Sequence, residues 1–572
     1  MEKSELSKYR TLVINVLIAA VAALLFVPGL GSVELFDWDE INFAESAREM
    51  IVTGDYLNVQ VNFQSFWEKP PLFTWLQVLS MKAFGINEFA ARFPNAIVGI
   101  ITLLLIFNIG RKNYSERFGF LWMGMYLVSF LSFFYFKSGI IDPWFNLFIF
   151  MGIYFMAKYS TTDENGKNKM LYAVISGASI GLGVMTKGPV ALLVFGLTFV
   201  IWLLFNKFRL NFRWKDVIVW VLVFCVVGGS WFVVLALTGH TYIIMEFIDY
   251  QIRLFQIEDA GHGGFPLYHF VILLFGMMPA SILALPSFGL RMTENPETKK
   301  KALRLNIIQK EENESFKTVF TWMLISFWVV LILFSIVNTK IIHYSSFCYF
   351  PLTFLAAFAV EKMLSGEQKL RKYQSVLLIV IASLWGIILT VLTIFDKIKE
   401  YIYPYVNDSF AIDCMSATSE WVGFEPLVGI ILILCTIVFC VLFRKKQNIG
   451  RLSILGAGNL LFVFTFMLMV VGEIEKYSQA SAVEFFESKK GEDCYIKTFG
   501  YYSYAHYFYS DRQPENRCDD ESFLLHGDLD KPCYFSVKNY PDDIENFKSK
   551  AEDADFLYSK TGFSFFVRMP KQ

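Results

Sequence analysis

Charged residues are scarce in this sequence, and the two signs nearly cancel. Only 18% of the 572 residues are Asp, Glu, Lys or Arg, and the formal net charge at pH 7 is −1. A nucleic-acid-binding chain needs a basic field that attracts phosphates, and this composition supplies none over the whole molecule. We therefore expect no nucleic-acid partner.

The eight cysteines also lack the paired CxxC spacing that is typical of zinc sites. Four of them lie inside apolar runs and have the character of ordinary buried residues: Cys225, Cys348, Cys435 and Cys440. Cys494, Cys518 and Cys533 lie near the C-terminus, where an oxidising compartment would permit a disulfide among them.

Apolar residues are abundant instead. They make up 55% of the chain, and the mean hydropathy of +0.45 exceeds what the core of a soluble domain of this size usually needs. Runs long enough to cross a bilayer predict about thirteen spans, namely 12–30, 95–110, 118–137, 143–158, 171–186, 188–205, 216–238, 267–290, 319–337, 342–360, 375–395, 425–443 and 452–472. The sequence predicts a polytopic α-helical membrane protein.

The first apolar run follows the basic segment MEKSELSKYR, an arrangement that signal peptides and first membrane spans share. The run from Leu12 to Leu30 has about the ~20 residues that cross a bilayer, and no small-residue cleavage site with a soluble domain follows it. We therefore expect a retained span rather than a cleaved signal.

Lys and Arg in short loops predict the orientation, because such loops stay in the cytoplasm. Basic loops alternate along the chain and share the side of the N-terminus: 111–117, 158–169, 206–215, the segment from 291, 367–373 and 444–451. The opposite loops are acidic, aromatic or Gly-rich: 31–94, 137–142, 239–266, 396–424 and everything after Gly472. In the inner (plasma) membrane this places the C-terminal segment on the external, periplasmic side.

The C-terminal hundred residues have shorter apolar runs than the rest of the chain. Short aromatic and β-branched runs, CYIKTFG, YAHYFYS, PCYFSVK and FSFFVRM, alternate with polar turns and one helical stretch near Ile544 to Asp553. We divide the chain into a transmembrane domain, 1–472, and a small external α/β domain, 473–572.

The stretch FDWDEINFAESAREM places three acids directly after the first span. Asp37 and Glu40 have the spacing of a capping box, which explains them as a helix start. Residues 41–52 predict an interfacial helix with Asn42, Glu45, Ser46 and Glu49 on its polar face. Asp39, at the first turn, has no structural task in this interpretation, so it is a candidate for chemistry.

The segment FWEKPPLFTW follows in the same loop. Two prolines forbid helix at Lys69 and stiffen the exit, while four aromatic residues suit the headgroup level of a bilayer. A surface turn with a solvated pair of Glu68 and Lys69 would also fit. A stiffly held lysine at this depth is nevertheless well placed to bind a phosphate.

Three further external features complete the candidate set. Asp142 precedes Pro143 at the start of a span, where helix capping alone is an alternative explanation. His262 lies in a Gly-rich loop, and NTKIIHYSSFCYFP brings Lys340, His343 and Tyr344 to the mouth of another span. A lone histidine is more often structural than catalytic.

These residues resemble a known family. The segments DWDEINFAESAREM, GDYLNVQ, FWEKPPLFTWL and FGINEFAARFP, in this order, are similar to the signature of GT-C membrane glycosyltransferases of the protein mannosyltransferase superfamily, nearest the aminoarabinose lipid A transferase branch. The resemblance is dense over residues 37–95 and fits about thirteen spans followed by an external domain. One departure is that Asn42-Phe43 stands where the family usually has Arg-Tyr, which leaves the donor sugar and the acceptor open.

The resemblance implies an inverting glycosyltransferase that moves a sugar from a polyprenyl-phosphate donor to lipid A, another glycan or a protein, on the outer face of the inner membrane. It implies these roles: Asp39 and Asp142 as the site carboxylates, Lys69, Glu68, Tyr344 and Lys340 at the donor, and Glu68 with His262 as candidate ligands of a divalent metal ion. No other cofactor is expected.

The chemistry of such a reaction agrees with the placement of these residues. A carboxylate can deprotonate an acceptor hydroxyl and a cation can stabilise a departing lipid phosphate, while the lipid keeps its tail in the bilayer. A transporter or flippase of a lipid-linked substrate is the alternative. It would place charges midway along its spans, often in related halves. Here the acids gather at span ends, and no internal repeat is present.

Overall fold

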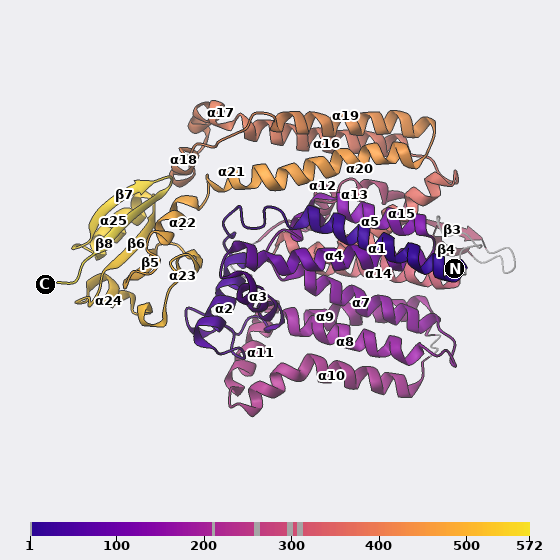
Figure 1. Ribbon diagram of the computed structural model, residues 1–572, viewed down its shortest axis with the longest axis horizontal. Coiled ribbons are helices and arrows are strands. Elements are labelled where there is room, and N and C mark those ends of the chain that lie inside the picture. Colours follow the sequence, from indigo (N-terminus) through magenta and orange to yellow (C-terminus); the bar gives the residue numbers. More distant parts are fainter. Residues whose placement is uncertain (1–2, 209–211, 257–262, 295–300, 306–312, 572) are drawn as a thin grey trace.

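The computed structural model describes residues 3–208, 212–256, 263–294, 301–305 and 313–571. Figure 1 shows an elongated molecule in which side-by-side helices form the larger part and a smaller unit of strands and short helices covers one end. The N-terminus lies at the opposite end of the bundle, and the C-terminus lies in the smaller unit.

Nine helical segments within these ranges are long and apolar enough to cross a membrane. They are α1 (Lys3–Phe26), α4 (Glu88–Asn113), α8 (Lys169–Lys187), α10 (Trp214–Leu237), α14 (Glu314–Ile336), η2 with α15 (Ile342–Leu364), α16 (Lys372–Thr393), α19 (Glu425–Lys445) and α20 with its continuation through α21 (Ile449–Glu475). Each lies on a predicted span. The chain is therefore a polytopic helical membrane protein.

The other four predicted spans coincide with helices that are interrupted, shorter or less apolar. These are α5 (Glu116–Val128) with α6 (Phe130–Tyr135), α7 (Asp142–Thr161), α9 (Val190–Phe205), and α12 (Tyr268–Gly276) with α13 (Ala280–Leu283) and η1 (Leu285–Phe288). The total of thirteen spans stays a prediction.

Glycines allow two helices of the bundle to pack closely. A Cβ added to Gly181 of α8 would lie 2.9 Å from the backbone nitrogen of Gly228 of α10, and one added to Gly177 would lie 2.7 Å from the carbonyl oxygen of Trp220. Small residues permit this approach of backbones where lipid offers no hydrophobic drive between helices. The contact fixes α8, whose last residue is Lys187.

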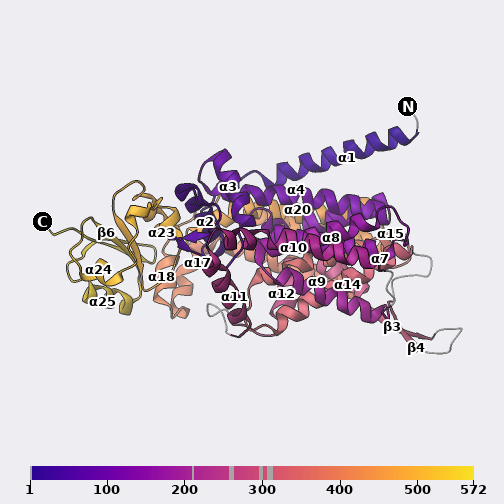
Figure 2. The same cartoon turned by 90° about the horizontal axis from the view of Figure 1, so that it is seen from below.

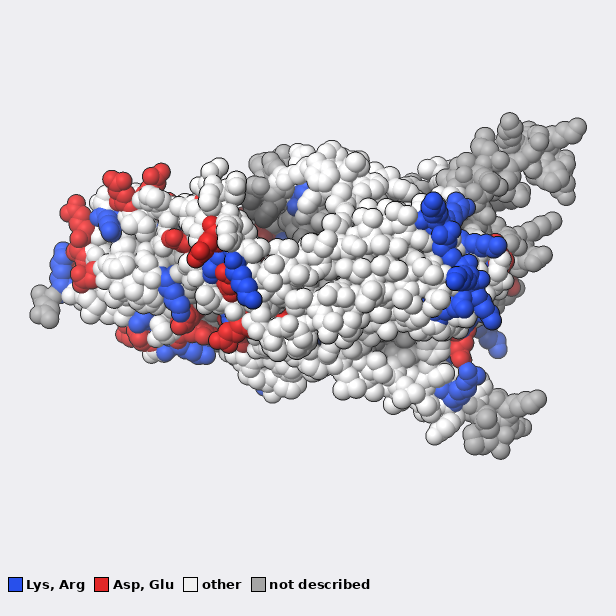
Figure 3. Space-filling view, turned by 90° about the horizontal axis from the view of Figure 1, so that it is seen from above, with Lys and Arg blue, Asp and Glu red and all other residues white. Residues whose placement is uncertain are grey.

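Charge divides the two ends of the molecule. On the face drawn in Figure 3, Lys and Arg gather at the end of the bundle that lies away from the C-terminal unit, a band without charged side chains follows, and most acidic side chains lie at the C-terminal end. This pattern agrees with the predicted alternation of basic loops. One of those loops, from residue 291, contains the antiparallel strands β3 (Leu290–Glu294) and β4 (Lys301–Leu305), at the same end as the N-terminus in Figure 2.

The C-terminal unit is built on a four-stranded sheet. Its strands are β5 (Tyr495–Phe499), β6 (Cys533–Lys538), β7 (Asp555–Lys560) and β8 (Phe563–Arg568), in the order β5-β6-β8-β7, with only the β5 and β6 pair parallel. Four helices accompany it: α22 (Ala480–Glu487), α23 (Ala505–Phe508), α24 (Glu521–His526) and α25 (Pro541–Lys550). The aromatic run YAHYFYS forms α23 rather than a strand, and all eight cysteines are free.

The first external loop contains α2 (Asp39–Thr53), the short antiparallel strands β1 (Gln60–Val61) and β2 (Gln64–Ser65), and α3 (Leu72–Phe84). The predicted helix at 41–52 is present, but its polar face is not at an interface with water. Every residue from Glu40 to Met50 is buried. The prediction of an interfacial helix is wrong because the C-terminal unit covers the polar face: Arg48 of α2 forms an ion pair with Asp511 of that unit at 3.0 Å, besides the one with Glu45 at 2.7 Å.

Four further helical elements complete the fold. These are α11 (Thr241–Gln256), α17 (Phe395–Ile402), η3 (Tyr403–Tyr405) and α18 (Ser409–Met415), together with the short turn η5 (Pro514–Asn516). In Figure 1, α11, α17 and α18 lie at the end of the bundle nearest the C-terminal unit. The charged segments of the external loops therefore gather around one end of the bundle.

Candidate active site

A cavity of about 960 Å³ lies where the span ends meet the first external loop. Its walls come from α2, the segment before α3, the start of α7, the ends of α8 and α14, α11 and η2. Polar side chains line one part of it: Asp37, Asp39, Glu40, Glu68, Lys69, Asp142, Lys187, His343 and Tyr344. Apolar side chains of the spans line the rest, including Phe130, Leu131, Val190, Val194, Val330 and Leu333.

Asp39 is the first residue of α2, and its side chain is 40% exposed, so it remains open to a second molecule. Its Oδ2 lies 3.4 Å from Nε2 of His343, whose side chain is only 14% exposed. The sequence places His343 at the mouth of a predicted span but assigns it no role. The structure pairs it with the candidate carboxylate.

Glu68 and Lys69 lie in the cavity on the segment stiffened by Pro70 and Pro71. Their charged atoms are 3.6 Å apart, a long ion pair, and the hydroxyl of Tyr250 donates to Glu68 Oε2 at 3.1 Å. The Lys69 ammonium also lies 5.2 Å from the centre of the Tyr250 ring. Lys69 is thus held by loose contacts and keeps donor capacity for an anion.

Asp142 and Lys187 form the tightest ion pair of the cavity. Lys187 Nζ donates to Asp142 Oδ1 at 2.8 Å, and the side chains are 15% and 4% exposed, respectively. The second carboxylate oxygen of Asp142 is buried without a hydrogen-bond partner. Lys187 also lies 5.5 Å from the centre of the Tyr344 ring. The pair joins the start of α7 to the end of α8.

Lys187 was not among the candidate site residues that the sequence indicated. A signal for it was present, because TKGP interrupts two apolar runs at 171–186 and 188–205 with a single charged residue at a predicted external end. A lone charge at such a point is costly unless it is paired or functional.

Lys340 lies outside the cavity lining. Its ammonium donates to the carbonyl oxygens of Phe334 at 3.1 Å and Ser335 at 2.8 Å, and to that of Val337, at the end of α14. Lysine at a helix C-terminus satisfies carbonyls that have no partner within the helix. The structure therefore gives Lys340 a structural task, and a direct contact with the donor is not supported.

His262 lies outside the described residues, so its pairing with Glu68 as a metal ligand stays a prediction. Over the part of the chain that the structure describes, no group of three or more His, Cys, Asp and Glu side chains is arranged to hold a metal ion.

The predicted capping box is wrong. Helix α2 begins at Asp39, and Trp38 before it makes no side-chain cap. Glu40 instead forms a buried ion pair with Arg92 at 2.8 Å and accepts from the nitrogen of Phe36 at 2.8 Å. Asp37 accepts from the nitrogen of Tyr504 at 3.4 Å, and burial raises the pKa of Asp37. Both acids hold tertiary contacts that local spacing cannot reveal.

Comparison with known proteins shows which proteins this chain resembles. Residues 68–231 match the family described as dolichyl-phosphate-mannose-protein mannosyltransferase. An undecaprenyl phosphate-alpha-4-amino-4-deoxy-L-arabinose arabinosyl transferase of Wigglesworthia glossinidia brevipalpis is 24% identical over 85% of this chain and 81% of that protein. A similarly named protein of Pseudomonas fluorescens is 27% identical over 62% and 60%, respectively.

The fold agrees with a solved structure. The crystal structure of ArnT from Cupriavidus metallidurans bound to undecaprenyl phosphate superimposes with a TM-score of 0.73 over 97% of this chain and 99% of that chain, at 16% identity. In sequence and in fold the chain is thus similar to GT-C glycosyltransferases of the arabinosyl transferase and protein mannosyltransferase kind. At that identity the structural likeness shows the fold alone, so the roles of individual residues rest on the geometry described above.

The cavity is lined by residues of α2 and α11, which lie at the end of the bundle nearest the C-terminal unit in Figure 1. The sequence-predicted residues Asp39, Glu68, Lys69, Asp142 and Tyr344 all line it. They come from four separate parts of the chain, namely α2, the segment before α3, α7 and η2, and the fold alone brings them together.

Proposed function

We propose that this protein transfers a sugar from a polyprenyl-phosphate carrier to an acceptor, with inversion at the reacting sugar carbon, on the side of the membrane where the C-terminal unit lies. One observation carries the proposal: a single cavity joins an apolar wall of membrane spans to a polar end with two carboxylate and lysine pairs, Glu68 with Lys69 and Asp142 with Lys187. A lipid-linked sugar has this same division between tail and head.

Lys69 and Lys187 are the cations for the donor phosphate. Lys69 is held by a 3.6 Å contact with Glu68 and by the Tyr250 ring at 5.2 Å, so its ammonium can still approach a phosphate oxygen. Lys187 is fixed by Asp142, which holds its charge at one point of the cavity. Two cations on a leaving phosphate stabilise the negative charge that develops as the sugar departs. The apolar wall from α9 and α14 holds the first part of the lipid tail.

Asp39 is the general base. It accepts the proton of the attacking acceptor hydroxyl, whose oxygen forms a bond to the sugar carbon while the bond from that carbon to the phosphate oxygen breaks. The lipid phosphate leaves with the electron pair, and attack from the face opposite to it inverts the centre. His343, 3.4 Å from Asp39, orients the carboxylate. The carboxylates lie at span ends rather than midway along spans, which gives no support to a transporter.

The relatives bear names that specify undecaprenyl phosphate and 4-amino-4-deoxy-L-arabinose, so this donor is the first to test. Purified protein is incubated with a panel of polyprenyl-phosphate sugars and with lipid A, a soluble glycan or a peptide as acceptor, and products are identified by mass spectrometry. We expect transfer from at least one donor. Loss of Asp39 as a base should reduce turnover by about 10²- to 10⁴-fold in Asp39→Asn.

The matched control is Asp37→Asn, two residues away in the same cavity wall. Asp37 holds the loop at Tyr504, so its loss should affect stability more than the chemical step. Equal activities of the two folded variants would reject Asp39 as the base, and no transfer from any donor in the panel would reject the proposed function.

A further inference from the structure

Three aromatic rings from distant parts of the chain meet beside the cavity. Trp38 directly precedes Asp39, and Tyr502 and Tyr504 lie in the loop between β5 and α23 of the C-terminal unit. The Trp38 ring centre is 5.0 Å from that of Tyr502 and 5.4 Å from that of Tyr504. Figures 1 and 2 both place α23 next to α2. The two units thus build one aromatic cluster.

The cluster has a buried support and two open rings. Tyr504 is only 5% exposed and packs edge-on against Tyr502 at 5.2 Å, whereas Trp38 is 44% exposed and Tyr502 is 58% exposed. Asp37 ties the loop in place by accepting from the Tyr504 nitrogen at 3.4 Å. Because Trp38 both lines the cavity and is open to solvent, the two open rings mark where the cavity meets the surface.

Polar groups line the cavity that Trp38 also lines. The carboxylates of Asp37 and Glu68 are part of that lining. A sugar ring has one face of weakly positive C–H groups, which suits the negative face of an aromatic ring, and a rim of hydroxyls, which need hydrogen-bond partners. An aromatic surface with a polar rim therefore matches a saccharide in both respects.

We propose that Trp38 and Tyr502 form the acceptor subsite and that its ligand is a sugar ring of a saccharide acceptor. The inference rests on the proposed function, because it needs Asp39 to be the base. Trp38 and Asp39 are neighbours in the chain, so a sugar ring on Trp38 places its hydroxyls close to the carboxylate. Tyr502 belongs to the C-terminal unit, and charged side chains gather at that end of the molecule in Figure 3, which favours a polar sugar over a lipid tail.

The first experiment measures binding without turnover. Full-length protein in lipid nanodiscs is mixed with di-N-acetylchitobiose or with a serine-containing peptide, and saturation-transfer NMR reports which protons contact the protein. We expect the disaccharide ring protons to receive saturation. Tyr502→Ala should weaken disaccharide binding by about three- to tenfold, since an aromatic contact contributes about that factor, while Tyr502→Phe keeps the ring and should keep binding.

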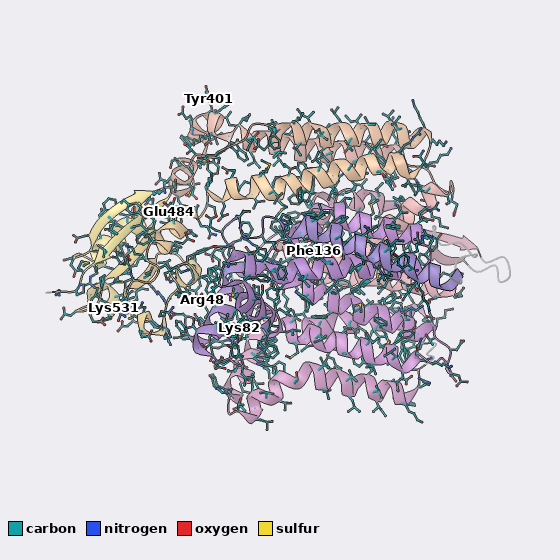
Figure 4. All side chains as sticks on the ribbon, in the orientation of Figure 1. Arg48, Lys82, Phe136, Tyr401, Glu484 and Lys531 are labelled. Atoms are coloured by element: carbon teal, nitrogen blue, oxygen red, sulfur yellow. The ribbon has the colours of Figure 1, made fainter. Side chains whose placement is uncertain are left out.

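The control is Tyr401→Ala. Tyr401 is 78% exposed on α17, away from Arg48 of α2 in Figure 4, so its loss removes an exposed tyrosine elsewhere on the same end. Binding of the disaccharide should be unchanged in this variant. Absent disaccharide binding in the parent protein, equal binding by Tyr502→Ala, or Tyr502-dependent binding of the peptide in place of the disaccharide would each overturn the saccharide subsite.

A second experiment separates this inference from the function on which it rests. Binding of undecaprenyl phosphate is measured in the same nanodiscs, and transfer kinetics are measured with the best acceptor of the panel. Tyr502→Ala should raise the acceptor KM by about three- to tenfold and leave donor binding unchanged. Donor binding or transfer that fails in the parent protein rejects the proposed function, whereas a normal acceptor KM in Tyr502→Ala rejects only the subsite.

Discussion

Arg48 of α2 donates to Asp511 of the C-terminal unit across 3.0 Å, although 463 residues separate them in the chain. The Arg48 side chain is fully buried, as is that of Glu45, its partner at 2.7 Å on the same helix. The helix that begins with Asp39 is therefore fastened to the C-terminal unit, and the position of the candidate base depends on both parts of the molecule.

Replacement of Arg48 should be far more damaging than replacement of Asp511. Arg48→Met leaves the buried charge of Glu45 uncompensated, which costs about 3–5 kcal/mol in comparable pairs. Asp511 is 38% exposed, and water can replace part of its contact, so Asp511→Asn should cost no more than about 1 kcal/mol. Thermal unfolding of the two purified variants, followed by tryptophan fluorescence, gives the comparison. Equal midpoints would contradict the burial argument.

Glu49 should make stability dependent on pH. Burial, followed by repulsion from Glu45, raises the pKa of Glu49 to about 9, so the folded protein holds a proton that the unfolded chain releases near its ordinary pKa of 4.5. Stability from this group is complete below that ordinary value and is lost as pH rises through about 9. We expect the unfolding midpoint of the parent protein to fall between about pH 6 and pH 9.

Glu49→Gln provides the test, because it keeps the shape of the protonated side chain and cannot ionise. Its unfolding midpoint should fall less steeply over the same range, and it should be the more stable protein at alkaline pH. Parallel curves for the two proteins would show that Glu49 is ionised in the folded state.

The pair of Asp142 and Lys187 allows folding and donor binding to be separated. Lys187→Met alone leaves a buried carboxylate without its partner and should destabilise by about 3–5 kcal/mol. Adding Asp142→Asn removes that charge, so the double variant should recover most of the stability while donor binding stays weak. Thermal unfolding and undecaprenyl phosphate binding are measured side by side. Donor binding that recovers together with stability would assign the pair a purely structural role.

The two lysines that were predicted at the donor, Lys69 and Lys340, should differ in effect. Lys69→Ala should weaken donor binding by about one to two orders of magnitude, since a charge-assisted bond contributes about 1.5–3 kcal/mol. Lys340→Ala should lower thermal stability instead, because three carbonyl groups at the end of α14 lose their donor. Donor titrations of both variants test these two roles. A normal donor affinity in Lys69→Ala would show that Lys69 does not bind the donor, and a strongly reduced affinity in folded Lys340→Ala would show that Lys340 does.

Local patterns predicted the helices well because the signal is carried by runs of residues. Every predicted span has a helix over it, since apolar side chains in lipid require a backbone that satisfies its own hydrogen bonds. The residue pattern did not predict the environment of α2. Its polar face resembles a water-facing surface in sequence, but the C-terminal unit covers it. The residue pattern also failed for Lys340, since a lysine near the cavity mouth and one that caps a helix look alike in sequence.

The sequence by itself determined the membrane-spanning class and the gathering of acids in the first external loop, and it named Asp39, Lys69 and Asp142 as candidates, because these follow from composition, short spacings and family-like motifs. Only the tertiary structure decided which charges face one another: His343 with Asp39, Lys187 with Asp142, and Arg48 with Asp511. The reason is physical, since a charge in a low-dielectric interior is stable only beside its partner, and that partner can come from any point of the chain.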